Sequence, residues 1–161
     1  MSIQTFKKGD NVEIIKIKEI NGNEPHNIHS FSYFSGNVLR SPRRGRHQVY
    51  VEYKTLKLET SKGLLKPMRE YVEIVHLRPL PPQEGQENER GFELCENVDA
   101  FHDNVWRKGL VVGILRCSKY LVLFDGFEKE VEVDGNCLRV HREWSDGLWK
   151  PPFDHKVNLF V

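Results

Sequence analysis

Short stretches of alternating apolar and polar residues run through most of the chain, with turn-forming residues between them. Residues 9–17 are rich in β-branched side chains, and residues 47–53 place three apolar side chains on one face of a strand. The second half contains four more candidate strands, at residues 97–101, 109–115, 119–124 and 129–133. An Asp125-Gly126 pair after the third of these predicts a hairpin turn. Short strands at this spacing, without a convincing helix between them, predict an all-β fold of small antiparallel barrels.

A proline-rich and then polar segment, residues 78–91, divides the chain into two halves. The halves resemble each other, since each opens with a polar-led strand and closes on a Leu-Arg pair, Leu77-Arg78 or Leu138-Arg139. We therefore predict an internal repeat. Its expected parts are a first barrel in residues 1–82, a linker in 83–91, a second barrel in 92–150 and a C-terminal tail in 151–161.

Composition fits a folded protein without an obvious cofactor. Hydrophobic residues make up 39% of the chain and charged residues 29%, and no apolar stretch approaches the roughly 18 residues of a membrane helix. The first residues lack the pattern of a signal peptide. Three cysteines show no paired spacing and no zinc-ligand spacing to a histidine. We expect an intracellular protein, or a piece of one, with structural thiols, no bound metal or cofactor and no membrane partner.

The net charge of +1 hides an asymmetry between the halves. Residues 1–82 carry 14 basic and 8 acidic residues, a net +6, whereas residues 83–161 carry 10 basic and 15 acidic residues, a net −5. Opposite net charges favour contact between the halves. We expect a monomer in which the two barrels are packed together as one rigid unit.

Several short motifs occur in an order that resembles the plant Agenet family of Tudor-like chromatin readers, whose members often occur as tandem pairs. The matching segments are residues 6–13, 53–56, 67–72, 77–82, 98–102 and 138–144. The resemblance covers nearly the whole chain and implies two tandem Tudor-like antiparallel β-barrels. It also implies a nuclear, non-catalytic reader that binds a methylated histone tail peptide, in particular the histone-three tail with its heterochromatic dimethyl-lysine.

Aromatic residues of the first repeat are the candidates for a methyl-lysine cage. A methylated ammonium remains a cation but sheds water easily, so aromatic faces attract it. The candidate rings are Tyr33, Phe34 and Tyr53, with Phe31 in reserve; Tyr33 stands where the family usually has tryptophan. The alternative is that individual rings fill the barrel core.

The second repeat carries a similar group of rings, Phe101, Trp106, Phe124 and Phe127. The family usually has two adjacent tryptophans here, but this chain has Trp106-Arg107. A guanidinium stacked on Trp106 would occupy the ligand position, so we expect a filled or structural site. The acidic residues of this rim could hold basic residues of the tail or form a solvated surface; they are Asp99, Asp103, Asp125 and Glu128.

Two other functions compete with peptide reading. Catalysis is disfavoured because no hydrolase elbow, zinc-protease or phosphate-loop motif occurs and the cysteines lack a nearby histidine. RNA or DNA binding through the basic segment 40–47 is the stronger rival, although the acidic second half interrupts any continuous phosphate-tracking surface. A methyl-independent peptide-binding module is a third alternative.

Three histidines of the first repeat, His26, His29 and His47, flank its aromatic segment and are candidate pH sensors. If one of them lines the cage or the peptide path, its protonated ring repels a cationic ligand. Peptide affinity would then increase with pH. The alternative is that all three are exposed and contact no ligand.

Overall fold

The computed structural model describes residues 5–20, 28–82, 91–126 and 129–153, which form twelve strands and two short 3-10 turns. The first repeat contains β1 (Asn11–Ile20), β2 (Ile28–Arg40), β3 (Gln48–Glu59), β4 (Leu65–Glu73), the turn η1 (Ile74–His76) and β5 (Leu77–Pro79). The second contains β6 (Asn97–His102), β7 (Val105–Ile114), β8 (Lys119–Phe124), β9 (Val131–Asp134), η2 (Gly135–Cys137) and β10 (Leu138–Val140). A hairpin follows, β11 (Glu143–Ser145) and β12 (Leu148–Lys150). In these ranges no helix is long and apolar enough to cross a membrane.

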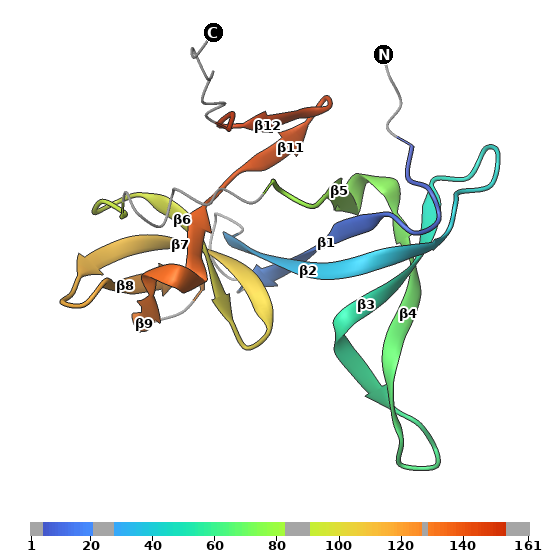
Figure 1. Cartoon of the computed structure of the whole chain (residues 1–161), viewed down its shortest axis with the longest axis horizontal. Helices are drawn as coiled ribbons and strands as arrows, with labels where there is room; N and C mark the ends of the chain where they lie inside the picture. The colour runs from blue at the N-terminus through green and yellow to red at the C-terminus, as the bar shows by residue number, and fades with distance from the viewer. Residues whose placement is uncertain (1–4, 21–27, 83–90, 127–128, 154–161) are drawn as a thin grey trace, which may run out of the picture.

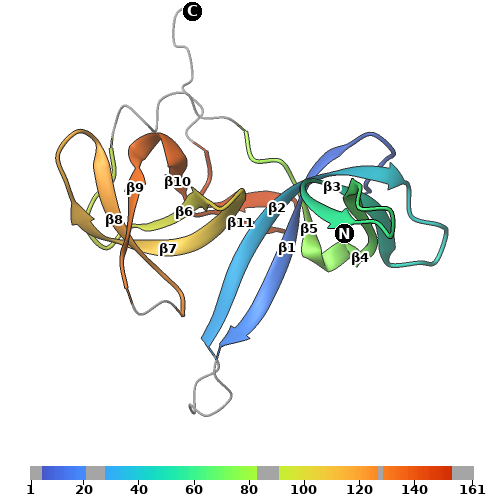
Figure 2. The same cartoon turned by 90° about the horizontal axis from the view of Figure 1, so that it is seen from below.

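Two separate hydrophobic cores confirm the prediction of an all-β fold with two barrels. The apolar faces of strands in residues 6–77 build the first core, which includes Val12, Ile14, Val49, Val51 and Tyr53. Residues 92–138 build the second core, which includes Val98, Ala100, Val111, Val122 and Phe124. The two barrels lie on opposite sides of the molecule in Figures 1 and 2, with β1 and β2 between them.

The repeats are related by approximate twofold symmetry within one sheet. The strand order along its main path is β10-β6-β7-β2-β1-β5. Each repeat contributes three of these strands, its last, its first and its second, and the order in one repeat is the reverse of the order in the other. Where the repeats meet, β2 pairs with β7 through Tyr33 and Trp106. These two residues occupy corresponding positions, since each lies three residues before a buried glycine of its strand, Gly36 or Gly109.

Both of those glycines stand where neighbouring strands approach too closely for a side chain. A Cβ atom on Gly36 would lie 2.8 Å from the carbonyl oxygen of Glu52, and one on Gly109 would lie 2.6 Å from a methyl group of Val122. Each glycine therefore lets the second strand of its repeat pack tightly on the third. This shared feature supports the interpretation of the halves as repeats.

Two parts of the structure were not predicted. Strands β3 and β4 continue past a register shift into a long hairpin, which projects from the first barrel in Figure 1. Residues 143–150, which we had assigned to the second barrel, form the separate two-stranded sheet β11-β12. Aromatic contacts hold this hairpin together, because the ring of Trp149 lies 5.0 Å from that of Trp144 and 5.8 Å from that of Phe153.

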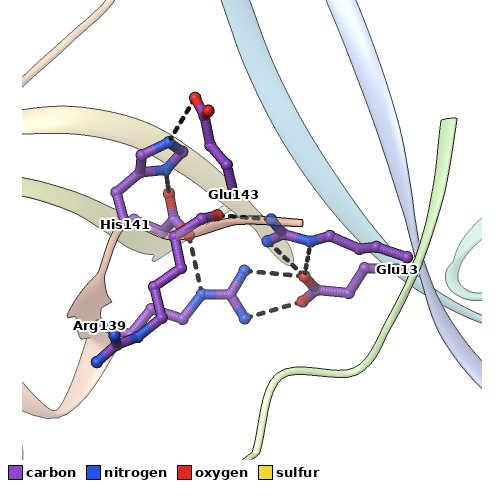
Figure 3. Close-up of polar contacts among 7 residues, drawn as sticks. Glu13, Arg139, His141 and Glu143 are labelled. Carbon is purple, nitrogen blue, oxygen red and sulfur yellow. Dashed lines mark hydrogen bonds and ion pairs between the residues drawn. The ribbon is translucent and has the colours of Figure 1, made fainter. Parts of the chain in front are cut away.

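A buried cluster of charges joins the two barrels (Figure 3). Glu13, which is 1% exposed, accepts hydrogen bonds from Arg78 of its own repeat at 2.7 Å and from Arg139 of the other repeat at 2.8 Å. Arg139 also donates to Asp99 at 3.0 Å, and the Nδ1 atom of His141 lies 2.7 Å from the same carboxylate. Burial alone would lower the pKa of Arg139, but the carboxylates of Glu13 and Asp99 outweigh burial and raise it. The cluster therefore holds its charges by mutual pairing.

Aromatic rings cover the two arginines of this cluster. The Arg78 guanidinium lies 3.9 Å from the ring centre of Tyr33 and 5.0 Å from that of Trp149, and Arg139 lies 4.2 Å from that of Trp106. Arg78 also donates a 2.7 Å hydrogen bond to the carbonyl oxygen of Arg142. Docking of the barrels thus rests on specific paired and stacked side chains rather than only on the opposite net charges of the halves.

Candidate functional site

One end of the first barrel carries two adjacent aromatic rings, Phe34, which is partly buried, and Tyr53, which belongs to the core and is 1% exposed. Phe34 lies on β2 directly opposite Ile14 of β1, and Tyr53 follows Val51 on the core-facing side of β3. The ring centres of Phe34 and Tyr53 are 5.8 Å apart and the rings are nearly perpendicular, a favourable edge-to-face arrangement. The structure therefore brings these two of the predicted cage residues together.

A carboxylate and a lysine complete this group. The Tyr53 hydroxyl donates a hydrogen bond to Glu70 of β4, and the ammonium of Lys16 lies 2.6 Å from the same carboxylate. The Lys16 ammonium also lies 5.5 Å from the Tyr53 ring centre, within cation-π range. Lys16 reaches this place because it is two residues after Ile14 on β1, on the core-facing side at the mouth of the barrel. We call the four residues Lys16, Phe34, Tyr53 and Glu70 the lysine site.

The carboxylate of the lysine site is suited to a cation, and Lys16 occupies that position in the structure. Burial alone would raise the pKa of Glu70, but hydrogen bonds from Lys16 and Tyr53 outweigh burial and lower it. Burial and then the bond to Glu70 raise the pKa of Tyr53, so its hydroxyl stays protonated and donates. At neutral pH the site thus presents an ionised carboxylate beside aromatic rings. Neither Lys16 nor Glu70 was identified from the sequence.

The other two predicted cage rings lie on the opposite face of β2. Tyr33 is adjacent to Phe34 in the strand, so their side chains point to opposite sides. Tyr33 is 4% exposed and its ring is covered by Arg78 in the contact between the barrels. Phe31 shares this face and lies 5.7 Å from the ammonium of Lys108. The predicted four-ring group is therefore divided between two sides of the strand.

In the second repeat the predicted rings are also divided. Phe101 and Trp106 contact each other at 5.2 Å, and Phe101 is 39% exposed. Arg139, not Arg107 as we had expected, supplies the guanidinium over Trp106. The reason is strand alternation, which puts Arg107 on the other side of β7 from Trp106.

The barrel mouth of the second repeat differs chemically from the lysine site. Phe124 corresponds to Tyr53 and His102 corresponds to Lys16, and the His102 ring stacks on Phe124 at 6.0 Å. In each repeat, a basic side chain of the first strand therefore contacts an aromatic ring of the third strand. Lys16 of β1 contacts Tyr53 of β3, and His102 of β6 contacts Phe124 of β8. Arg107 takes the position of Phe34. At this end of the barrel, a pair of phenylalanine and tyrosine rings therefore occurs only in the first repeat, as far as the described residues show.

The predicted acidic contacts of the second repeat are dispersed. Asp99 is 1% exposed and already paired with Arg139 and His141, so it is not a surface contact for a peptide, contrary to our prediction. Asp103 is exposed in the β6–β7 turn beside His102, and Asp125 is half-buried after β8. Phe127 and Glu128 lie outside the described residues.

The candidate pH-sensing histidines do not line the lysine site where they are described. His29 is exposed near the start of β2, five residues from Phe34, which is roughly 17 Å along a strand. His47 is exposed before β3, six residues from Tyr53, or roughly 20 Å. His26 lies outside the described residues. Within those residues there is also no group of three or more side chains that could hold a metal ion, and Cys95, Cys117 and Cys137 are free thiols.

Comparison with known proteins points to one family. A family model of the Agenet domain matches residues 26–82. The Arabidopsis thaliana protein named AGENET DOMAIN (AGD)-CONTAINING P1 is 35% identical over 127 residues, which are 76% of this chain and 24% of that protein. DUF724 domain-containing protein 6 of the same plant is 31% identical over 153 residues, 92% of this chain and 20% of that protein. The chain therefore spans a quarter or less of the length of these relatives.

Solved structures show the same fold in both repeats. A crystal structure of Arabidopsis thaliana AGDP1 AGD34 aligns with a TM-score of 0.70 at 24% identity, covering 89% of this chain and 88% of that one. A crystal structure of ADCP1 tandem Agenet domain 3-4 aligns with a TM-score of 0.68 at 24% identity, covering 89% and 86%. Because these matches run across both barrels, they confirm the prediction of a tandem pair.

Proposed function

Because the chain belongs to the Agenet family, a group of reader-type rather than catalytic domains, we propose that it is a nuclear chromatin reader that binds a methylated lysine of a histone tail. The binding position is the lysine site of the first barrel. The proposed ligand is the histone-three tail carrying its heterochromatic dimethyl-lysine, a basic peptide that the net −5 second half would attract.

The observation that carries this proposal is the position of Lys16. Its ammonium occupies a place beside the Tyr53 ring and against the Glu70 carboxylate. The side chain of Lys16 is 44% exposed, so it can move away without disturbing the core. A lysine of a bound peptide would then take the same place, with Phe34 and Tyr53 as walls and Glu70 as counter-charge.

The chemistry of the site favours a partly methylated lysine. Methyl groups weaken hydration of the ammonium and pack against aromatic faces, with about 0.5–2 kcal/mol per good contact. Glu70, in contrast, accepts a hydrogen bond, and a dimethyl-ammonium still has one N–H to donate. A trimethyl-ammonium has none, so it would leave the carboxylate without its hydrogen bond. The combination of two rings and one carboxylate therefore supports mono- or dimethyl-lysine over trimethyl-lysine.

Calorimetric titration with histone-three peptides tests the proposal. We expect the dimethylated peptide to bind about tenfold more tightly than the unmodified peptide, a difference of about 1.4 kcal/mol. The trimethylated peptide should bind more weakly than the dimethylated one because it cannot donate to Glu70. Equal affinity for the unmodified and dimethylated peptides would instead indicate methyl-independent peptide binding.

The pH dependence of binding follows from Glu70. Its pKa is lowered, so the carboxylate loses its charge only as the pH falls through a value below the ordinary range for glutamate. Affinity for the dimethylated peptide should therefore change less than about twofold between about pH 6 and pH 8.5, a window around the ordinary histidine value. The same titration at several pH values measures this. Affinity that rises clearly with pH would contradict the prediction and point to His26, His29 or His47 on the peptide path, which single His→Ala variants would identify.

A further inference from the structure

The far end of the first barrel from the lysine site carries an unusual concentration of positive charge. Two cations come from the turn before β1 and four from the end of β2 and the β2–β3 loop; they are Lys7, Lys8, Arg40, Arg43, Arg44 and Arg46, all exposed. We call this surface the basic end. Hydrogen bonds join its two segments, since the Lys8 amide donates to the Ser41 hydroxyl at 3.3 Å and the Gly9 amide donates to the Val38 carbonyl at 2.8 Å.

The charges of the basic end are not neutralised within the described chain. None of the six cations forms an ion pair with a residue of ranges 5–20, 28–82, 91–126 or 129–153. Some other cations of the same barrel are paired, as Lys16 is with Glu70 and Arg69 with Glu52. Six unpaired like charges repel one another, so an anion with several charges would relieve that repulsion.

The second repeat shows that the fold does not require these charges. Its corresponding turn has the same hydrogen bond, because the Glu93 amide donates to the Glu96 carboxylate at 2.9 Å just as the Lys7 amide donates to Asp10 at 2.8 Å. That turn is nevertheless acidic. The loop corresponding to β2–β3, residues 115–118, carries a single cation, Arg116. The charge of the basic end is therefore a property of the first repeat and not of barrel folding.

A phosphate-rich polymer matches this surface better than a single small anion. Guanidinium groups bind phosphate oxygens through two parallel hydrogen bonds, and duplex DNA presents one charge about every 1.7 Å along its axis. Arg40 ends β2, and the other five cations lie on the β2–β3 loop and the turn before β1 rather than on a helix. Exposed loop cations suit contact with the backbone rather than with base edges. We infer that the basic end binds the phosphodiester backbone of duplex DNA, a function separate from peptide reading at the lysine site.

Fluorescence anisotropy with a labelled duplex of about 20 base pairs, at several salt concentrations, tests this inference. The variant Arg43→Gln/Arg44→Gln/Arg46→Gln removes three of the six cations. The control Lys57→Gln/Lys62→Gln/Lys66→Gln removes the same charge from the exposed tip of the β3–β4 hairpin. Each lost phosphate contact lowers the slope of log affinity against log salt by about 0.9. We expect the arginine variant to bind at least tenfold more weakly with a slope smaller by about 2–3, and the control to lose less than about threefold.

Several results would overturn the inference. They are equal binding by the parent and the arginine variant, an equal loss in the control, or tighter binding to a single strand of the same length. Competition by polyglutamate as effective as that by unlabelled duplex would assign the surface to acidic polypeptides instead. Circular dichroism verifies that both variants are folded. The arginine variant should bind the histone-three peptide with the same affinity as the parent. The peptide titration therefore tests the lysine site, and the DNA titration tests the basic end, separately.

Discussion

Replacing Glu13 by Ala should lower the free energy of unfolding by about 3–5 kcal/mol, the typical cost of breaking a buried ion pair by removing one partner. Glu13 bridges Arg78 of the first repeat and Arg139 of the second, and its side chain is almost fully buried. The variant would leave two guanidinium groups in the contact between the barrels with fewer partners. Urea unfolding followed by intrinsic fluorescence measures the change.

Glu52→Ala is the matched control for that experiment. Glu52 also pairs with an arginine, Arg69 on the adjacent strand, but the Arg69 side chain is 55% exposed. Its loss should therefore cost less than about 1 kcal/mol. NMR relaxation gives a second readout, because the parent should tumble as one unit and Glu13→Ala should let the barrels move more independently. Similar stability of the Glu13→Ala and Glu52→Ala variants would show that the cluster does not hold the barrels together.

Replacing Glu70 by Gln should weaken binding of the dimethylated peptide by about 1.5–3 kcal/mol, the usual value for a hydrogen bond to a charged group. The amide keeps the shape of the side chain and can still accept the hydrogen bond from Tyr53, so the barrel should remain folded. What is lost is the negative charge facing the ligand ammonium. Calorimetric titration of parent and variant with the same peptide gives the difference.

The control for charge is Glu52→Gln, which removes the same charge from the neighbouring β3 strand, away from the ligand position. It should leave the peptide affinity within about twofold of the parent, because exposed charges interact weakly through water. An equal loss of peptide affinity in the two variants would mean that Glu70 acts only through the net charge of the protein and not through a contact with the ligand. A Glu70→Gln variant that binds as tightly as the parent would remove Glu70 from the site.

Much of the fold was predictable because strand alternation and repeat symmetry are local signals. The strands predicted at residues 97–101, 109–115, 119–124 and 129–133 correspond to β6, β7, β8 and β9. The predicted turn at Asp125-Gly126 has Gly126 at a φ of +83°, where glycine is favoured. The C-terminal hairpin was missed because its strands are three residues long and its stability comes from contacts between Trp144, Trp149 and Phe153.

The site was only partly predictable because side-chain direction decides which rings meet. Phe34 and Tyr53 were identified correctly as neighbours, whereas Tyr33 was grouped with them although adjacent strand residues face opposite sides. A stricter use of alternation would have separated Tyr33 from Phe34. Lys16 and Glu70 have no local signature, since their pairing depends on strands 54 residues apart in sequence.

The buried charge cluster does correspond to a pattern that is visible in the sequence. Glu13 and Asp99 stand at corresponding positions directly after the first valine of their strands, and Arg78 and Arg139 stand in the two closing Leu-Arg pairs. A charged residue repeated at the same place in two apolar strands indicates a paired, buried charge. The sequence showed these correspondences, but not that the two repeats share one cluster.

The most direct test of the account is an NMR measurement of contacts between the N-methyl protons of a dimethylated histone-three peptide and the protein. Binding at the lysine site predicts nuclear Overhauser effects from these protons to the rings of Phe34 and Tyr53. The side-chain signals of Lys16 should shift at the same time, because the ligand ammonium takes its place beside Glu70. Contacts to Phe101 and Trp106 instead, with unchanged Lys16 signals, would contradict the account.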